Sequence, residues 1–340
     1  MQEAATTPRP QIASCPHLAA KESAPDIMLW VVGALAPAAV WAVWNMGSTA
    51  GTVFIVSIVS CLGTEALWNY LAKRPQTLMD WSALVTAILL AMTLPPRTPW
   101  WMVLAGGVVA IGLGKMLFGG LGWNLFNPAL VGRAMITISW AGVLAVQKVP
   151  GGWFQGIDVA ETGGLDAING ATRLAIAAAD RAAEGGYGFD LGAQFEPLLF
   201  RNLEGCIGEV SAALLILGGL VLILKGIIDW RIPAGYIGTV AVLSGLCGSQ
   251  GFLDEAIFNV LAGGVLLGAF FMATDYVTSP MTKTGRLVFA CGCGLINCVG
   301  RFYGPMPEST TFAILFMNGL VPLIDRSLRP RTYGWVSKRE

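Results

Sequence analysis

The sequence contains few charged residues. Asp, Glu, Lys and Arg make up 12% of its 340 residues, about half of the share found in soluble domains, whereas hydrophobic residues take 55%. The core of a soluble protein is too small to bury so many apolar side chains, so many of them would be exposed on its surface. The composition therefore excludes a disordered chain and an ordinary soluble enzyme, and it indicates an integral membrane protein in contact with a lipid bilayer.

Other features that the sequence lacks exclude further classes of function. The formal net charge is zero with a single histidine, His17, so no basic face is available for nucleic acid. The seven cysteines are odd in number and lie mostly in apolar runs, which argues against a disulfide framework. Cys291, Cys293 and Cys298 match no common zinc or iron–sulfur spacing. We interpret them as packing residues and expect no metal site. Residues 1–26 are polar and do not resemble a cleavable signal peptide.

Apolar stretches long enough to cross a bilayer recur along the chain. We expect an all-α protein with about ten transmembrane helices, of which the third and ninth are short enough to be half-inserted or broken. They cover residues 27–44, 50–71, 79–95, 100–118, 129–147, 207–224, 232–248, 257–274, 286–299 and 311–325.

The positions of Lys and Arg orient these helices. With ten crossings and a cytoplasmic N-terminus, fifteen of the 21 basic residues fall on the cytoplasmic side. The opposite orientation would reverse this bias, so we expect both termini in the cytoplasm.

The chain then divides into five parts. These are a cytoplasmic N-terminal tail (1–26), a first membrane helix group (27–149), an extracytoplasmic insert (150–205), a second membrane helix group (206–325) and a cytoplasmic C-terminal tail (326–340). A long loop such as the insert is usually functional or disordered. In addition, Val-Leu-Ala-Gly-Gly-Val occurs at 103–108 and again at 260–265. This is either a trace of an internal repeat, as in many transporters, or a chance recurrence.

Four polar clusters stand out against the apolar background, of which the fourth, residues 318–330 with Asp325, Arg326 and Arg329, is explained mostly by a membrane-anchoring tail on the positive, cytoplasmic side. The insert contains Asp166-Ala-Ile-Asn-Gly-Ala-Thr172, in which Asn-Gly alone would indicate a turn and Thr172 a helix N-cap. Residues 119–133 hold four glycines and the amides of Asn124 and Asn127. Glycines let the backbone approach a ligand, and amides hydrogen-bond a flat heterocycle; the alternative is a loop between tightly packed helix ends.

The third cluster begins at Asp275, which ends an otherwise uncharged span and is followed by a loop rich in Ser and Thr. Ionisable residues at such positions point to function, so Asp275 is a candidate for ion coupling. The alternative is a helix-end carboxylate paired with Lys283 or Arg286.

These motifs resemble those of a known family. Residues 119–133 resemble the signature loop shared by the D subunit of the Rnf complex and the B subunit of the sodium-translocating NADH:quinone reductase. The segment from Thr274-Asp275 is similar to their second signature. Residues 166–172 resemble their flavinylation motif, although the family usually has Ser where this chain has Asn169. The length and the short N-terminal tail resemble the Rnf protein.

The resemblance implies two flavins and a fold similar to that of urea transporters. FMN would be held through a phosphoester on Thr172, and riboflavin would be bound without a covalent link at the Asn124/Asn127 loop. The site residues are then Asn169, Gly170, Ala171 and Thr172 for FMN, and Lys115, Asn124, Asn127 and Arg133 for riboflavin.

The implied function is electron transfer across the bacterial cytoplasmic (inner) membrane, as one component of an ion-translocating ferredoxin:NAD+ oxidoreductase, with no catalytic residues of its own. Ferredoxin and NAD+ would bind partner subunits, including another flavin-bearing subunit and iron–sulfur subunits, because this chain has no four-cysteine spacing and no dinucleotide loop. The alternatives are a quinone-reducing subunit of a sodium-translocating NADH dehydrogenase and a channel or transporter for a small solute.

Overall fold

The computed structural model describes residues 23–145, 174, 195–202, 205–248, 251–304 and 308–329. Over these residues every regular element is a helix, which confirms the all-α prediction. The principal helices are α1 (Ala24–Met46), α2 (Ser48–Leu71), α3 (Ser82–Thr93), α4 (Trp100–Gly112), α5 (Pro128–Ser139), α6 (Ala141–Ala145), α8 (Phe195–Phe200), α9 (Ala212–Leu224), α10 (Arg231–Cys247), α11 (Phe252–Leu261), α12 (Val265–Leu267), α13 (Lys283–Tyr303) and α14 (Thr310–Ser327). Shorter turns are η1 (Leu78–Asp80), η2 (Met116–Phe118), η5 (Ile207–Glu209) and the π-helical η6 (Gly268–Met272).

Local sequence signals set several helix starts. At α1, the Ser23 hydroxyl accepts from the Asp26 amide while the Asp26 carboxylate accepts from the Ser23 amide, which is a capping box. Helix α5 begins with an Asn127 cap followed by Pro128, the residue favoured in a first helical turn. Thr282 caps α13 in the same way. These caps satisfy amides that have no partner inside the helix.

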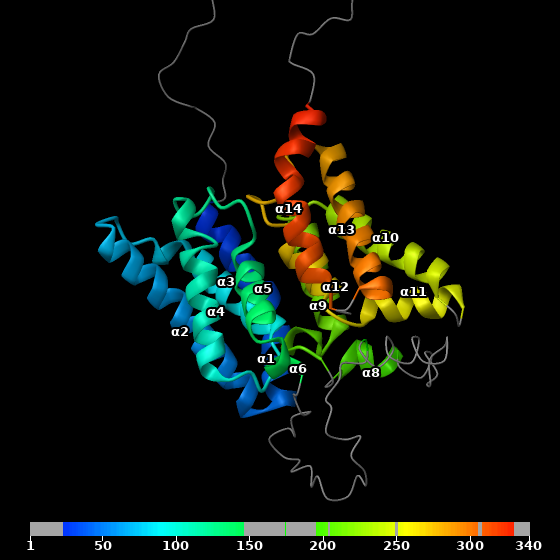
Figure 1. Ribbon diagram of the computed structural model, residues 1–340, viewed down its shortest axis with the longest axis horizontal. Coiled ribbons are helices and arrows are strands. Elements are labelled where there is room, and N and C mark those ends of the chain that lie inside the picture. The colour runs from blue at the N-terminus through cyan, green and yellow to red at the C-terminus, as the bar shows by residue number, and fades with distance from the viewer. Residues whose placement is uncertain are drawn as a thin grey trace, which may run out of the picture.

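The described helices form two halves with the same pattern of neighbours. In the first half α2 packs on α3 and α4, and α4 packs on α5; in the second half α10 packs on α11 and α13, and α13 packs on α14. The halves lie side by side and meet where α1 packs on α9 (Figure 1). Helix α5 runs downward in Figure 1 whereas α14 runs upward, so the two halves run in opposite directions. This arrangement agrees with a repeat-built fold; the similarity to urea transporters stays a prediction.

Each half contains an interrupted helix. Helix α3 has 12 residues and is therefore about 18 Å long, little more than half of the bilayer core. In the second half, α11 and the α12–η6 segment are bent by 67° at a break, where Ala262 is extended and Gly263 has a φ of +74°. The expectation of a short third helix is confirmed.

The expectation of a short or broken ninth helix is wrong. Helix α13 runs for 21 residues, and it is the eighth stretch, 257–274, that breaks. The apolar window 286–299 understated α13, because the helix continues past it through basic residues: Lys283 lies before its start and Arg301 after its end. The break in the eighth stretch is stabilised by a side chain far away in the sequence, since Arg301 donates to the carbonyls of Asn259 and Ala262 in place of the next helical turn.

The exterior of the helices is apolar. Val40, Ile55 and Val59, for example, expose 68%, 63% and 65% of their surface, as side chains facing lipid would. Among the described helices, α1, α2 and the stretch Trp100–Phe118 are long and apolar enough to cross a membrane, and the bent pair from α11 to η6 is either a broken span or a re-entrant loop. The other apolar helices are shorter, so the number of ten spans stays a prediction.

The two ends of the molecule carry different segments. Helix α1 begins and α14 ends at the upper end of Figure 1, whereas α6, which precedes the central insert, and α8, which lies within it, are at the lower end. The described parts of the two tails and of the insert are therefore separated by the length of the helices. Which end faces the cytoplasm stays a prediction, as do the five divisions of the chain.

Candidate functional site

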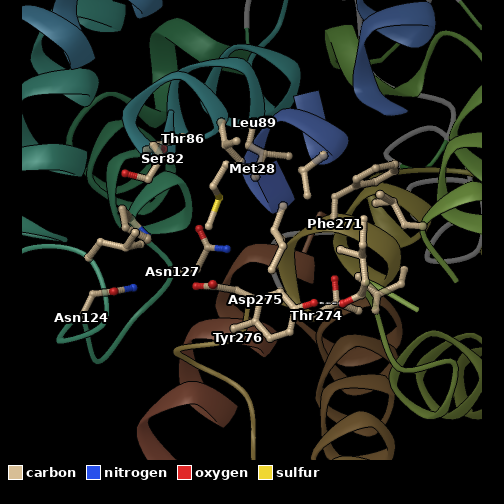
Figure 2. Close-up of a pocket in the computed structure, with 18 of the residues that line it drawn as sticks. Met28, Ser82, Thr86, Leu89, Asn124, Asn127, Phe271, Thr274, Asp275 and Tyr276 are labelled. Atoms are coloured by element: carbon tan, nitrogen blue, oxygen red, sulfur yellow. Dashed lines mark hydrogen bonds between the residues drawn. The ribbon is translucent and has the colours of Figure 1, made fainter. Parts of the chain in front are cut away.

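A cavity of about 80 Å³ lies at the upper end of the molecule, between the two halves. We call it the Asn127 cavity. Figure 2 shows Asn124, Asn127 and Asp275 arranged around it, with Leu89 and Phe271 on its apolar wall. Its lining comes from the starts of α1, α3 and α5, the end of α9, and the segment from η6 to Tyr276. The structure thus brings together two signature segments that lie about 150 residues apart in the sequence.

Asn127 joins the two halves at this cavity. Its side-chain oxygen accepts from the Ala129 amide at 3.0 Å and caps α5, while its nitrogen donates to the carbonyl of Met272 at 3.2 Å. Met272 is the last residue of η6, so one side chain binds the start of α5 and the end of the half-helix opposite. This positioning role is one that the residue type alone does not reveal.

Asn124 has an unused acceptor. Its side-chain nitrogen donates to the carbonyl of Phe126 at 3.2 Å, but its buried oxygen, Oδ1, has no hydrogen-bond partner among the described residues. The residue is only 5% exposed. A buried acceptor without a partner costs about 1–3 kcal/mol, so this atom indicates a place where a donor from a ligand would be stabilising.

Asp275 lines the same cavity. Its carboxylate accepts from the Val277 amide at 3.5 Å and from the Thr278 hydroxyl at 3.2 Å, and Asn124 also hydrogen-bonds to it. Burial raises the pKa of Asp275 despite these hydrogen bonds.

The expected basic partners of Asp275 are engaged elsewhere or do not reach it. Arg286 pairs with Asp229 at 2.7 Å and donates to the Pro280 carbonyl. Among the described residues, neither Lys283 nor any other basic side chain forms a salt bridge with Asp275. The alternative of a carboxylate held by Lys283 or Arg286 is therefore not what the structure shows.

Lys115 lines the cavity, but its ammonium group is already paired with other side chains. Its ammonium lies 3.0 and 2.9 Å from the two oxygens of Glu65 and 2.5 Å from the Ser82 hydroxyl. Glu65 is 0% exposed and Lys115 is 2% exposed, and Glu65 also accepts from Thr77. Lys115 therefore fixes the start of α3 against α2 and offers no free donor to a ligand.

Arg133 does not belong to the Asn127 cavity. It lies a turn and a half further along α5, and its guanidinium pairs with Glu308 at 3.1 Å. Adjacency in the sequence suggests one site for residues 119–133, but the helix that begins at Pro128 carries Arg133 away toward the other end of the molecule. The structure places it in a second cavity, described below.

The flavinylation motif, from Asp166 to Thr172, lies outside the described residues. Leu174 follows it by two positions and is buried against Leu198, Phe258 and Ala262. The chain just after the motif therefore packs on α8 and on the α11–α12 break, which is the lower end of Figure 1. Whether Thr172 carries a flavin stays a prediction.

Sequence reasoning missed two positioning residues. Glu65 is a carboxylate inside the apolar stretch 50–71, a signal that was available because such residues are costly in a membrane. Asn318 lies on α14, in a segment whose basic residues suggest only an anchoring tail. In the orientation that satisfies its amide, its side chain donates to the Thr278 carbonyl and accepts from the Asn127 backbone amide, each at 3.2 Å. It thereby ties α14 to both signature segments.

The apolar exterior, the interrupted helices and the enclosed polar cavity define a multi-pass membrane protein with an internal polar site. Comparison with known proteins gives the family. Residues 11–334 match the family described as NQR2, RnfD, RnfE, and the chain belongs to this family.

Relatives of similar length support a narrower assignment. The chain is 42% identical to the D subunit of the Na(+)-translocating ferredoxin:NAD(+) oxidoreductase complex of Acetobacterium woodii, with 95% of each chain covered. It is 39% identical to the D subunit of an ion-translocating oxidoreductase complex of Stutzerimonas stutzeri, covering 92% of this chain and 93% of the relative. It is 40% identical to the D subunit of the proton-translocating ferredoxin:NAD(+) oxidoreductase complex of Clostridium ljungdahlii, covering 95% and 96%.

These comparisons confirm the resemblance to the D subunit of Rnf-type complexes and the prediction that the chain is part of an enzyme complex. The two relatives whose names specify an ion specify different ones, Na+ and the proton.

Proposed function

We propose that this chain is the flavin-carrying subunit of an Rnf-type ferredoxin:NAD+ oxidoreductase, and that it passes electrons across the bacterial cytoplasmic membrane. FMN would be attached to Thr172 and riboflavin would bind in the Asn127 cavity. The movement of Na+ or H+ would be coupled to this transfer. The observation that carries the riboflavin assignment is the buried, unpaired Oδ1 of Asn124.

The chemistry of the cavity fits a flavin. Phe270, Phe271 and Leu89 provide apolar walls, and Asn124 provides an acceptor for a ring or ribityl donor. Ligand sites combine apolar walls with a few placed polar groups in this way. The cavity volume of about 80 Å³ is below the roughly 300–1,000 Å³ typical of ligand pockets. Side chains at its rim, such as Met28 and Tyr276, would therefore have to move on binding.

The residues of this chain would then have distinct tasks. A bound flavin supplies reversible uptake of electrons and protons. Asn124 would orient the ring through its oxygen, and the apolar wall would exclude water. Asp275 would place a titratable carboxyl group beside the cavity, and burial raises the pKa of that group. Asn127 and Lys115 would keep the cavity walls in register through their contacts with Met272 and Ser82.

The orientation that we propose puts the Asn127 cavity near the cytoplasm and the insert outside. Its support is the bias of basic residues and the position of α6 and α8 at the end away from the Asn127 cavity. Flavins near opposite ends of the helices would give electrons a route across the membrane. The other flavin-bearing and iron–sulfur groups, and the sites for ferredoxin and NAD+, would belong to partner subunits.

The test is flavin content after substitution of Asn124. Asn124→Ala, produced in the complete complex, should lower extractable riboflavin about tenfold, which corresponds to about 1.4 kcal/mol of lost hydrogen bonding. Covalent flavin, measured as fluorescence of the denatured band on a gel, should persist. Asn45→Ala is a matched control, since Asn45 is also buried and donates to Trp41 of its own helix.

Unchanged riboflavin in Asn124→Ala would remove the assignment of the cavity. The same purified complex also distinguishes the two alternative functions, a quinone-reducing subunit and a small-solute channel. A small-solute channel would show no flavin absorption, and a quinone-reducing subunit would make the complex reduce quinone rather than NAD+ or ferredoxin.

A further inference from the structure

A second cavity, of about 30 Å³, lies toward the end of the molecule away from the Asn127 cavity. We call it the Glu308 cavity. The end of α3 and the start of α12 line it, together with Arg133 of α5 and Thr310 of α14. Both half-helices run between the two cavities. Helix α3 begins at the Asn127 cavity and ends at the Glu308 cavity, whereas the α12–η6 segment begins at the Glu308 cavity and ends at the Asn127 cavity.

Two carboxyl groups and a thiol meet in the Glu308 cavity. Oxygens of Glu209 and Glu308 and the sulfur of Cys206 all lie within 4.8 Å of one another. Arg133 Nη2 lies 3.1 Å from Glu308 Oε2 and 3.8 Å from Cys206 Sγ, and the thiol lies 3.7 Å from the same Glu308 oxygen. Glu209 is 8% exposed, whereas the side chain of Glu308 is 27% exposed, so solvent reaches the pair from the Glu308 side and screens their interaction only in part.

Arg133 shows that the cavity must contain a further acceptor. Its Nη1 group is buried and has no hydrogen-bond partner among the described residues, and the residue is 7% exposed. A buried guanidinium N–H without an acceptor is costly. The cavity has room for about one or two water molecules, and water can accept from Arg133 while donating to a carboxylate.

The charged groups around the carboxyl pair come from four elements. Arg133 belongs to α5, Cys206 and Glu209 to the η5 segment, Arg301 to α13, and Glu308 precedes α14. Arg301 gives two of its N–H groups to the carbonyls at the α11–α12 break, and its charge also acts on Glu209. Helices α3 and α12 contribute hydroxyl and apolar groups here, including Thr93 and Leu267.

A metal ion is the less suitable occupant. The three ligand types could bind a divalent cation, but Arg133 already lies between Cys206 and Glu308 and would repel it. The second guanidinium, Arg301, adds to that repulsion. A proton is different, because it binds one carboxyl of a closely spaced pair and removes the repulsion between them.

We propose that Glu209 and Glu308 form a proton-binding site, in which the pair holds one shared proton and exchanges it with water in the Glu308 cavity. In the exchange, a hydronium ion gives its proton to a carboxylate oxygen, which leaves a carboxylic acid and a water molecule. Arg133 balances the remaining negative charge. The site does not require a bound flavin, so its test is independent of the proposed function.

The test is infrared spectroscopy of the full chain in its complex. The carbonyl band of a protonated carboxylic acid, which shifts in D2O, should be present at neutral pH and decrease as the pH is raised. Glu308→Gln and Glu209→Gln should each remove this component. Arg133→Met should strengthen it at a given pH, because loss of the positive charge favours the protonated form. Asp254→Asn, at an exposed carboxylate on α11, is the control and should leave the band unchanged.

Two results would overturn the proposal. If neither Gln variant changes the band, both carboxylates are ionised and serve only as partners for the arginines. If instead Cd2+ binds the chain stoichiometrically with a thiolate absorption that disappears in Cys206→Ser, the cavity is a metal site. Glu308→Asp, which keeps a carboxyl group, should retain the band and guards against misreading a folding defect.

Discussion

The side chain of Asn127 donates a hydrogen bond to the carbonyl of Met272 and thereby connects the start of α5 in one half of the protein to the end of η6 in the other. The same side chain caps α5 through Ala129. Substitutions of Asn127 can therefore separate the contribution of the helix cap from that of the contact with Met272.

Asn127→Ala removes both contacts and should lower the free energy of unfolding by about 2–3 kcal/mol, from the cap and the buried carbonyl left without its donor. Asn127→Ser keeps a capping oxygen and should recover only part of this loss. Thermal unfolding of the detergent-purified variants measures both, with Asn45→Ala as the matched control. Equal stability of the Ser variant and the parent would show that the Met272 contact contributes nothing.

The buried salt bridge between Glu65 and Lys115 allows a prediction about stability. Lys115→Met should destabilise the chain by about 3–5 kcal/mol, because it leaves the fully buried Glu65 carboxylate without a counter-charge. The double variant Glu65→Leu, Lys115→Met should be much closer to the parent, since no isolated charge remains. A double-mutant cycle on thermal unfolding tests this; additive losses in the double variant would contradict it.

Asp275→Asn keeps the shape of the side chain and its acceptor for Thr278 while it removes the charge. We expect the complex to assemble but to lose the coupling between electron transfer and ion movement. The measurements are ferredoxin:NAD+ activity and ion uptake in inverted vesicles. Survival of both activities would leave Asp275 a structural role only, as an anchor for its loop.

Thr172→Ala should leave a folded, membrane-inserted chain without covalent flavin and with a broken electron path. If Thr172 were only a helix cap, the same change would cost about 0.5–2 kcal/mol of stability and leave the flavin in place. Asn169→Ser should be flavinylated at least as well as the parent. Mass spectrometry of peptides from 150–205 decides between these two roles, provided that the flavin transferase is expressed in the same cells.

Asp229 predicts a pH dependence of stability. Burial would raise its pKa, but hydrogen bonds from Arg231 and Arg286 outweigh this and hold the pKa of Asp229 below its usual value. A lowered pKa contributes stability above the unfolded value of about 3.9, and that contribution is lost as the pH falls through the folded pKa. Asp229→Asn should therefore be less stable than the parent at neutral pH, and the gap should close below about pH 4. The exposed Asp254→Asn is the control and should show no such gap.

The sequence predicted helices better than it predicted their interruptions. Apolar length located most of the described helices to within about five residues, because burial in lipid is a property of composition, although α5 ends at Ser139 rather than near residue 147. It could not locate the break, which depends on a distant side chain. Val-Leu-Ala-Gly-Gly-Val at 103–108 lies in the continuous helix α4, yet the same hexapeptide at 260–265 contains the α11–α12 break. At the second copy Arg301 donates hydrogen bonds to the carbonyls that the break leaves free. A Cβ on Gly263 would lie 2.8 Å from the Nη2 of Arg301.

The same limit applies to the site. Asn124, Asn127 and Asp275 can be found because amides and a carboxylate are conspicuous against an apolar background. Arg133 is assigned to the wrong neighbours because proximity in the sequence does not show which way a helix leads. Glu65 becomes significant only when the fold brings α2 against the start of α3, where Lys115 and Ser82 meet it.

The antiparallel placement of the two half-helices has an electrical consequence. Each helix carries about half a positive charge at its first turn and half a negative charge at its last. Since α3 and the α12–η6 segment point in opposite directions between the same two cavities, this pair gives each cavity one positive and one negative helix end. Their axial fields largely cancel along the line between the cavities. These two half-helices together therefore impose little voltage on a charge that crosses between the cavities, and the direction of flow is left to the groups at either end.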